Sequence, residues 1–124
     1  MVIIADTDVF IAAIRGNEIA QSLLRKYGGS IAVSAITAAE LYVGAKNHAK
    51  KKIVEQILND HELIELNKAI TEVAIRLIKT YNTSTKQLLV ADAFIAATCL
   101  ENKAALLTFN TKDFRFIKGL RLAK

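Results

Sequence analysis

The stretch MVIIADTDVF, residues 1–10, places four apolar residues directly before Asp6 and Asp8. A short apolar run that ends this abruptly is typical of a buried strand. Similar runs stand at residues 30–34 (SIAVS) and 104–109 (AALLTF), and apolar residues at helical spacing lie between them. Alternating strands and helices predict an α/β protein with a central parallel sheet flanked by helices. The first ten residues raise the question of why carboxylates follow a core strand.

The remaining pattern predicts the other elements of a three-layer fold with about four or five strands. In ELIEL, residues 62–66, polar and apolar residues alternate as in an edge strand. LRLAK, at the end of the sequence, is predicted as a short fifth strand. The predicted helices carry apolar residues three and four apart, and asparagine or glycine marks several of their ends. These helices are expected at residues 17–27, from about 37 to 45, and at 50–58, 67–81 and 89–100.

Charge and composition narrow the class of protein. The chain has 124 residues, 17 basic and 12 acidic side chains and a net charge of +5, which favours a polyanionic partner such as nucleic acid. Many basic proteins have no such partner, so charge alone does not establish that this protein binds nucleic acid. One cysteine excludes an internal disulfide. With no signal peptide and no apolar run near the roughly 20 residues of a membrane span, we expect one cytoplasmic domain over residues 1–124.

Acidic residues recur where the predicted strands end or the next helices begin. In parallel sheets, binding sites form beyond the carboxyl ends of the strands. Carboxylates packed there repel one another unless a cation neutralises them, and Mg²⁺ prefers oxygen ligands. Together with the positive net charge, this pattern predicts a metal-dependent nuclease. The acidic residues concerned are Asp6, Asp8, Glu40, Asp92 and Asp113.

Each acidic residue also has a purely structural interpretation. Asp6 is a suitable cap for the following helix. TAAE, residues 37–40, fits a capping box, in which Thr37 binds the amide of Glu40. Asp92 lies among apolar residues, and its main structural alternative is again an N-cap. Asp113 is compatible with an ordinary turn, so the prediction rests on the set rather than on any member.

Four segments in this order resemble the PIN-domain family, specifically the VapC-type toxins of bacterial and archaeal toxin–antitoxin pairs. They are IIADTDVFI, SAITAAELYVGA, VADAFIAATCL and LLTFNTKDFRFIKGLRL, which with the helices between them cover almost the whole chain. The resemblance implies a homodimer, an antitoxin whose C-terminal segment covers the site, and an RNA substrate. It also implies an endoribonuclease that uses Mg²⁺ or Mn²⁺ to activate water for phosphodiester hydrolysis.

The resemblance assigns roles to individual residues of this chain. Asp6, Glu40, Asp92 and Asp113 match the acidic quartet that binds metal. Thr7 and Thr108 match positions that support the site, Asn110 is expected to orient the last acid, and Asp8 adds charge suited to a second metal. Phe109 stands where many relatives carry arginine, which removes a basic group beside the site. For contacts to the RNA backbone, we expect Arg15, Lys46, Lys50, Lys112 and Arg115 to serve.

Two other functions fit the same resemblance. One is a degenerate PIN module that binds RNA or a protein without cutting. The other is a PIN nuclease of RNA maturation that has no antitoxin. A phosphoacceptor domain of the flavodoxin-like kind is disfavoured, because the third predicted strand runs into Asn67 with no aspartate to accept phosphate.

Overall fold

The computed structural model describes residues 1–124 and contains one parallel sheet. Its five strands stand in the order β3-β2-β1-β4-β5, so that β1 is central. Ile4 of β1 pairs with Ala32 on one side and Leu106 on the other. The parallel sheet predicted from the sequence is confirmed, with the ELIEL segment at its edge. The strands are β1 (Ile3–Ala5), β2 (Ile31–Ser34), β3 (Glu62–Ile64), β4 (Ala105–Leu107) and β5 (Arg121–Leu122).

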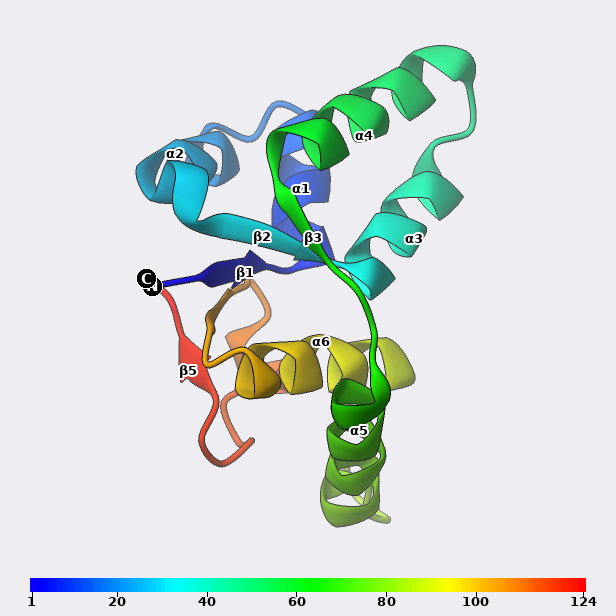
Figure 1. The fold of residues 1–124 in the computed structure, drawn as a ribbon, viewed down its shortest axis with the longest axis vertical. Coiled ribbons are helices and arrows are strands. Elements are labelled where there is room, and N and C mark those ends of the chain that lie inside the picture. The colour runs from blue at the N-terminus through cyan, green and yellow to red at the C-terminus, as the bar shows by residue number, and fades with distance from the viewer.

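Helices cover both faces of this sheet (Figure 1). Four of them lie on one face: α1 (Thr7–Ile14), α2 (Glu18–Tyr27), α3 (Ala35–Gly44) and α4 (His48–Asp60). The other face carries α5 (Lys68–Tyr81) and α6 (Val90–Glu101). Two short 3-10 turns complete the chain, η1 (Gly28–Ser30) and η2 (Thr111–Asp113). No helix combines the length and apolarity that crossing a bilayer requires.

The apolar run of β1 is explained by the two cores that it separates. Ile4 packs into the core shared with α5 and α6, whereas Ile3 and Ala5 pack into the core beneath α1 to α4. Successive side chains of a strand point to opposite faces, so a strand covered on both faces is apolar throughout. All three residues are fully buried or nearly so. A charged residue is therefore admitted only where β1 ends, at Asp6.

Asparagine caps three of the helices and sets where they begin. Asn17, Asn47 and Asn67 each accept a hydrogen bond of 2.9 Å from the backbone N–H three residues later. The caps at Asn17 and Asn67 confirm the predicted starts of α2 and α5. The cap at Asn47 starts α4 at His48, two residues earlier than the prediction.

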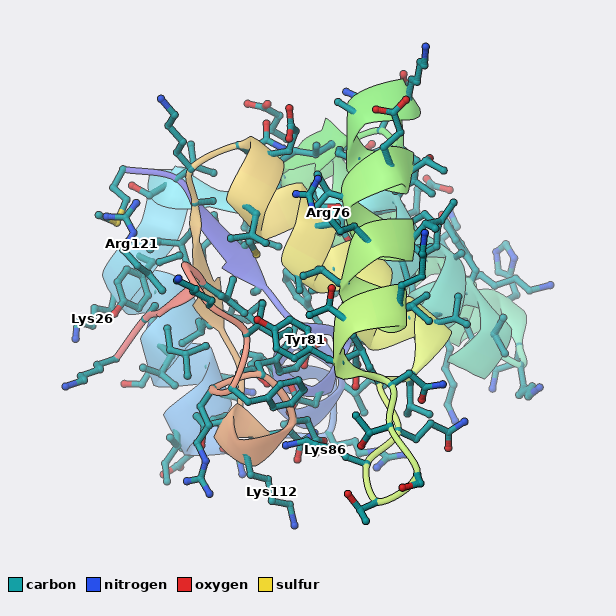
Figure 2. All side chains as sticks on the ribbon, turned by 90° about the horizontal axis from the view of Figure 1, so that it is seen from below. Lys26, Arg76, Tyr81, Lys86, Lys112 and Arg121 are labelled. Atoms are coloured by element: carbon teal, nitrogen blue, oxygen red, sulfur yellow. The ribbon has the colours of Figure 1, made fainter.

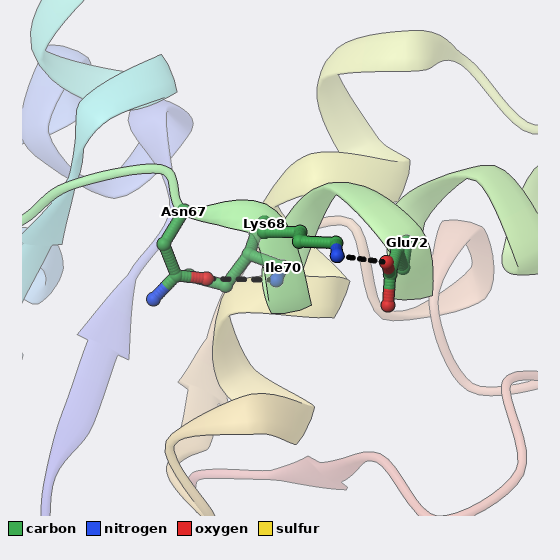
Figure 3. A network of polar contacts seen from close by, with 4 residues as sticks. All are labelled: Asn67, Lys68, Ile70 and Glu72. Carbon is green, nitrogen blue, oxygen red and sulfur yellow. Dashed lines mark hydrogen bonds and ion pairs between the residues drawn. The ribbon is translucent and has the colours of Figure 1, made fainter.

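Figure 3 shows the start of α5, where Asn67 caps the helix and Lys68 lies 3.9 Å from Glu72. Both charged side chains are largely exposed, and such an i,i+4 pair contributes only about 0.3–0.5 kcal/mol. It is nevertheless the one ion pair within 4.0 Å in the protein. The acidic residues of the sheet edge therefore have no basic partner.

Candidate active site

The site lies at the carboxyl edge of the sheet, where the chain leaves β1 and β4 side by side. β2 and β3 extend the sheet to one side of β1, and β4 and β5 extend it to the other. A crevice forms at such a switch point because the connections leave in opposite directions. Asp6 follows β1 and Thr108 follows β4, and both side chains are buried. The predicted location of the site is thus where the sheet topology favours one.

Asp6 both caps a helix and binds across the sheet. Its Oδ1 accepts a 2.8 Å hydrogen bond from the Thr7 backbone N–H, as a helix cap does. Its Oδ2 accepts a 2.8 Å bond from the Thr108 hydroxyl. Each carboxylate oxygen has a further lone pair. The structural interpretation of Asp6 is therefore correct, and it leaves the carboxylate free to bind a ligand as well.

Asp8 is held by the segment that follows β4. Its Oδ2 accepts bonds of 3.1 Å from the Phe109 backbone N–H and from the Asn110 side-chain amide. Its Oδ1 is buried without any hydrogen-bond partner. Asn110 was expected to orient Asp113, but its side chain holds Asp8 instead. Only its backbone carbonyl reaches the other acid, accepting 3.0 Å from the Asp113 N–H.

A row of hydroxyl groups orients Glu40. Thr7 Oγ1 lies 2.6 Å from Glu40 Oε1 and 2.9 Å from Thr37 Oγ1, and Ser34 Oγ lies 3.2 Å from Thr37 Oγ1. A hydroxyl has one proton to donate, and a carboxylate is its strongest acceptor. Thr7 therefore donates to Glu40, while Thr37 donates to Thr7. Ser34 completes the row by donating to Thr37.

The other two capping interpretations are wrong. Ser34 caps α3 by accepting from the Thr37 N–H at 3.1 Å, so the helix begins at Ala35 rather than near Thr37. Glu40 consequently lies in the second turn and cannot reach a cap. Leu89 occupies the cap position of α6, without a side-chain bond, and Asp92 lies in the first turn. A carboxylate there is favoured by the helix dipole.

Asp92 and Asp113 line a pocket of about 220 Å³. α6 supplies Asp92, and η2 supplies Asp113. Lys86 and Phe116 line the same pocket from the loop before α6 and from the segment after η2. Asp92 is half-buried, whereas Asp113 is exposed. The two acids thus form the open side of the site, and Asp6 forms its buried side.

Burial raises the pKa of three carboxyls, and repulsion by neighbouring acids adds to the rise in two of them, Asp6 and Asp92. Burial, with the nearby charges of Asp8 and Asp92, raises the pKa of Asp6 to about 7 against the hydrogen bonds that lower it. Burial also raises the pKa of Asp8. Burial, then the charges of Asp113, Glu40 and Asp8, raises the pKa of Asp92 to about 6. Asp92 is affected by the charges of three other acids, and Asp6 by those of Asp8 and Asp92, which places the five acids in one electrostatic cluster.

This cluster has the donors that a divalent cation requires. Carboxylate oxygens are the preferred ligands of Mg²⁺, and the unpartnered buried Oδ1 of Asp8 is an oxygen without a proton donor. The carboxylates are spaced apart, and no three side chains form a ready-made ligand group. Like charges separate when nothing between them attracts both. The residues present fit a hard cation by the chemistry of their donor oxygens.

The expected RNA-binding residues fall into two groups. Arg15 and Lys50 line a second pocket of about 310 Å³ between α1, α3 and α4, which also reaches Glu40. Lys112 lies in η2 beside Asp113, and Arg115 follows that turn. Lys46 is exposed in the connection between α3 and α4 and does not line this pocket. Two of the five, Arg15 and Lys50, therefore share a pocket with an acid of the site, and Lys112 and Arg115 are near Asp113 in sequence.

The family follows from the sequence match. Residues 3–120 match the PIN domain. The chain belongs to the PIN-domain family. It is 28% identical over 121 residues to Ribonuclease VapC10 of Mycobacterium tuberculosis, covering 96% of this chain and 90% of that protein. The family predicted from the four motifs is confirmed.

Solved structures of toxin–antitoxin complexes resemble this PIN domain in fold. A toxin–antitoxin complex from Klebsiella pneumoniae has 30% identity and a TM-score of 0.81, over 94% of this chain and 93% of that one. VapBC2 from Rickettsia felis, bound to a promoter DNA fragment, has 24% identity and a TM-score of 0.88, over 99% and 98% of the two chains. Coverage near the full length of both partners confirms the predicted three-layer fold.

Three residues of this PIN domain's site were not predicted from the sequence. Ser34 and Thr37 carry the hydroxyl row to Glu40, and Lys86 lines the pocket of Asp92 and Asp113. The signal for the first two was a serine that ends a strand, followed three residues later by a threonine. That spacing is typical of a cap and of two hydroxyls on one side of a helix turn. Lys86 lies in a loop whose pattern gives no such signal.

Proposed function

We propose that this chain is a metal-dependent endoribonuclease that acts as the toxin of a type II toxin–antitoxin pair. One observation carries the proposal: five carboxylates share the carboxyl edge of the sheet, and none has a basic partner within 4.0 Å. Such a cluster is costly to fold unless a cation binds it. The 28% identity to a ribonuclease supports RNA as the substrate class.

The chain's own residues hold the site in shape. Thr108 fixes the rotamer of Asp6, and Thr7 fixes that of Glu40, so two acids from different elements face the crevice. Asn110 and the Phe109 backbone N–H hold Asp8. Groups that bond the ligating acids in this way set their orientation and basicity. Asp6, Glu40, Asp92 and Asp113 are the proposed ligands, with Asp8 available for a second ion.

PIN-domain ribonucleases generally depend on a divalent metal, and Mg²⁺ is the proposed ion, with Mn²⁺ as its substitute. When bound, such an ion supplies a water of lowered pKa and neutralises charge on the phosphodiester. Glu40 or Asp113 is suited to assist proton transfer, because Glu40 accepts a hydrogen bond and Asp113 is open to solvent. The proposed reaction is the hydrolysis of a phosphodiester bond of RNA by water.

The proposed partners follow from the same relatives. Both solved structures named above are complexes that contain an antitoxin. We propose a cognate antitoxin for this chain, a homodimer as its assembly, and the cytoplasm as the place where it meets RNA. An antitoxin segment that covered the crevice would prevent RNA from reaching the acidic residues. The pocket between α1, α3 and α4 reaches Glu40, which makes it suited to such a segment.

The test is cleavage of total cellular RNA by the purified chain with Mg²⁺, with Mn²⁺ and with EDTA. Asp92→Asn removes one charge of the cluster at nearly constant volume, and Glu72→Gln on α5 is the matched control away from the site. Cleavage that requires the metal and is lost in Asp92→Asn, but not in Glu72→Gln, is expected. The cut ends then identify the RNA.

Two results would overturn the proposal. Cleavage that survives Asp92→Asn would mean that another site or a contaminant acts. A folded chain that binds RNA but cuts none with either metal would be a PIN module that binds without cleavage. Loss of toxicity on co-expression of a small neighbouring gene distinguishes the toxin from a nuclease of RNA maturation.

A further inference from the structure

A lysine lines the pocket that contains Asp92 and Asp113. Lys86 belongs to the loop between α5 and α6, six residues before Asp92 in sequence. Thr83 and Lys86 exchange backbone bonds of 2.8 and 3.4 Å, which closes this loop into a turn. The turn is followed by Leu88, which is buried in the core with α5 and α6. The backbone of Lys86 is therefore anchored on both sides.

An aromatic stack holds the side chain of Lys86. Its Nζ lies 3.6 Å from the centroid of the Phe116 ring, a close cation–π contact. Phe116 is itself fixed by Tyr81, whose ring meets it edge to face at a centroid distance of 5.2 Å. Tyr81 Oη accepts a 3.0 Å bond from the Lys118 backbone N–H. Figure 2 shows Tyr81 beside the last turn of α5 and Lys86 below the end of this helix.

The ammonium group of Lys86 remains uncompensated although two carboxylates line the same pocket. The protein's one ion pair is elsewhere, between Lys68 and Glu72, so neither acid lies within 4.0 Å of Lys86. A lysine that served only to neutralise the acids would close that gap. Phe116 instead holds the ammonium group at one side of the pocket, so that Asp92 and Asp113 remain free to bind a ligand.

We infer that Lys86 is a substrate-binding residue, which contacts a phosphate of single-stranded RNA next to the bond placed at Asp92 and Asp113. The inference rests on the proposed function for the identity of the substrate. A lysine binds phosphate as a point charge, and the fixed stem reduces the rotamer entropy that contact costs. The RNA backbone carries one phosphate per nucleotide. One phosphate would lie at the metal held by the acids, and the neighbouring phosphate would contact Lys86.

Single-stranded RNA is favoured over a duplex by the shape of the pocket. The pocket has a volume of about 220 Å³ and lies between a loop and a short turn. A pocket of this size accommodates part of a flexible single strand more readily than a double helix. Sequence-specific recognition of RNA also targets mostly single-stranded segments, whose bases are unstacked and accessible. Phosphate contacts of this kind make binding depend on salt, and that dependence is the signature to measure.

The test measures binding of a labelled uridine oligonucleotide with Ca²⁺ in place of Mg²⁺, so that a hard cation neutralises the carboxylates, and gel electrophoresis establishes that the oligonucleotide stays intact. The dissociation constant is determined across a range of salt concentrations for wild type, Lys86→Ala, Lys86→Arg and Phe116→Leu. Lys68→Ala is the control, because Lys68 is exposed at the far end of α5. Urea midpoints establish that each variant is folded.

Lys86→Ala is expected to weaken binding several-fold and to reduce the slope of log K against log salt by about 0.7, one single-strand phosphate contact. Lys86→Arg is expected to keep the slope. Phe116→Leu is expected to weaken binding with the slope unchanged, because the charge remains but is no longer held. Lys68→Ala should match wild type.

Equal slopes for Lys86→Ala and Lys68→Ala would overturn the inference, as would the absence of RNA binding by wild type. Cleavage assays on the same proteins separate the two proposals. If RNA is cut while Lys86→Ala leaves binding, its salt slope and KM unchanged, the ribonuclease stands and the phosphate contact is wrong. If binding depends on Lys86 but no RNA is cut, the contact stands and the ribonuclease is wrong.

Discussion

The hydroxyl of Thr108 donates a 2.8 Å hydrogen bond to Asp6 Oδ2, which joins residues 102 positions apart. The same hydroxyl oxygen accepts 3.0 Å from the Asn110 backbone N–H. One side chain thus links the ends of β1 and β4 to the turn that holds Asp8. Such links connect the fold to the charges that it brings together.

Thr108→Val is expected to destabilise the protein by about 1–3 kcal/mol, since a buried carboxylate oxygen and a backbone N–H each lose a partner. The measurement is the urea midpoint at constant pH. Thr108→Ser is the control, because it keeps the hydroxyl and removes only a methyl group. If valine and serine lower the midpoint equally, the methyl packing matters and the hydrogen bond does not.

Thr7→Val removes the bond to Glu40 at nearly constant volume. We expect metal affinity or cleavage to fall about 10- to 100-fold, the usual cost of losing a group that orients a metal ligand. Titration of Mn²⁺ by calorimetry and initial rates of RNA cleavage measure the two effects. Thr7→Ser should retain most of both. Unchanged metal affinity and rate in Thr7→Val would show that Glu40 needs no orientation.

The metal-free protein is expected to lose stability as the pH rises from about 4 to 7. The folded-state pKa values of Asp6, about 7, and Asp92, about 6, lie above the ordinary value of 3.8, so the folded chain retains protons that the unfolded chain has released. Protonation therefore stabilises the fold, and this contribution, complete below about pH 4, disappears as pH rises through 6 and 7.

Asp92→Asn tests the same linkage. The amide cannot ionise, so the variant should gain on the order of 1 kcal/mol over wild type at pH 8, a value reduced by partial solvent exposure. Below about pH 4 the two proteins should differ little, because the carboxyl is protonated in both the folded and the unfolded chain. Chemical unfolding in EDTA across this range provides the measurement. A wild-type stability that rises with pH would show that the acids are not destabilising one another.

Addition of Mg²⁺ or Mn²⁺ is expected to raise the melting temperature, and to do so more at pH 8 than at pH 5. Binding to the folded state alone stabilises by about 2.7 kcal/mol at a hundred times the dissociation constant. Protons compete for the same oxygens at low pH. Asp92→Asn should reduce the shift, and Glu72→Gln should not. An equal shift in both variants would mean that the ions bind elsewhere.

The fold was largely predictable because its signals are local. A fully buried strand such as β1 is apolar along its whole length, and Asn17 and Asn67 each mark a helix start by a cap one residue before it. The errors arose where two local signals compete. Ser34 ends β2 and caps α3 at once, so no connecting residue separates strand from helix. The visible TAAE pattern therefore led to a start two residues too late.

The partners within the site were less predictable. Acidic residues after strands identify the edge of the sheet, but the pairing of Asn110 with Asp8 depends on how the segment after β4 turns back. Lys86 meets Phe116, thirty positions away, only because the loop after α5 and the segment after η2 fold to the same corner. Contacts between two irregular segments have no periodicity from which to read them.

The strand order has a consequence for how the protein is made. β1 emerges first from the ribosome, yet its neighbour β4 is translated about a hundred residues later, after β2 and β3. A nascent chain can pair β1 with β2 early, but Asp6 has no Thr108 and the crevice no Asp113 until translation has passed residue 113. The acids of the site therefore cannot come together on a partly synthesised chain. The catalytic centre of this fold is therefore one of its last features to be completed during synthesis of residues 1–113.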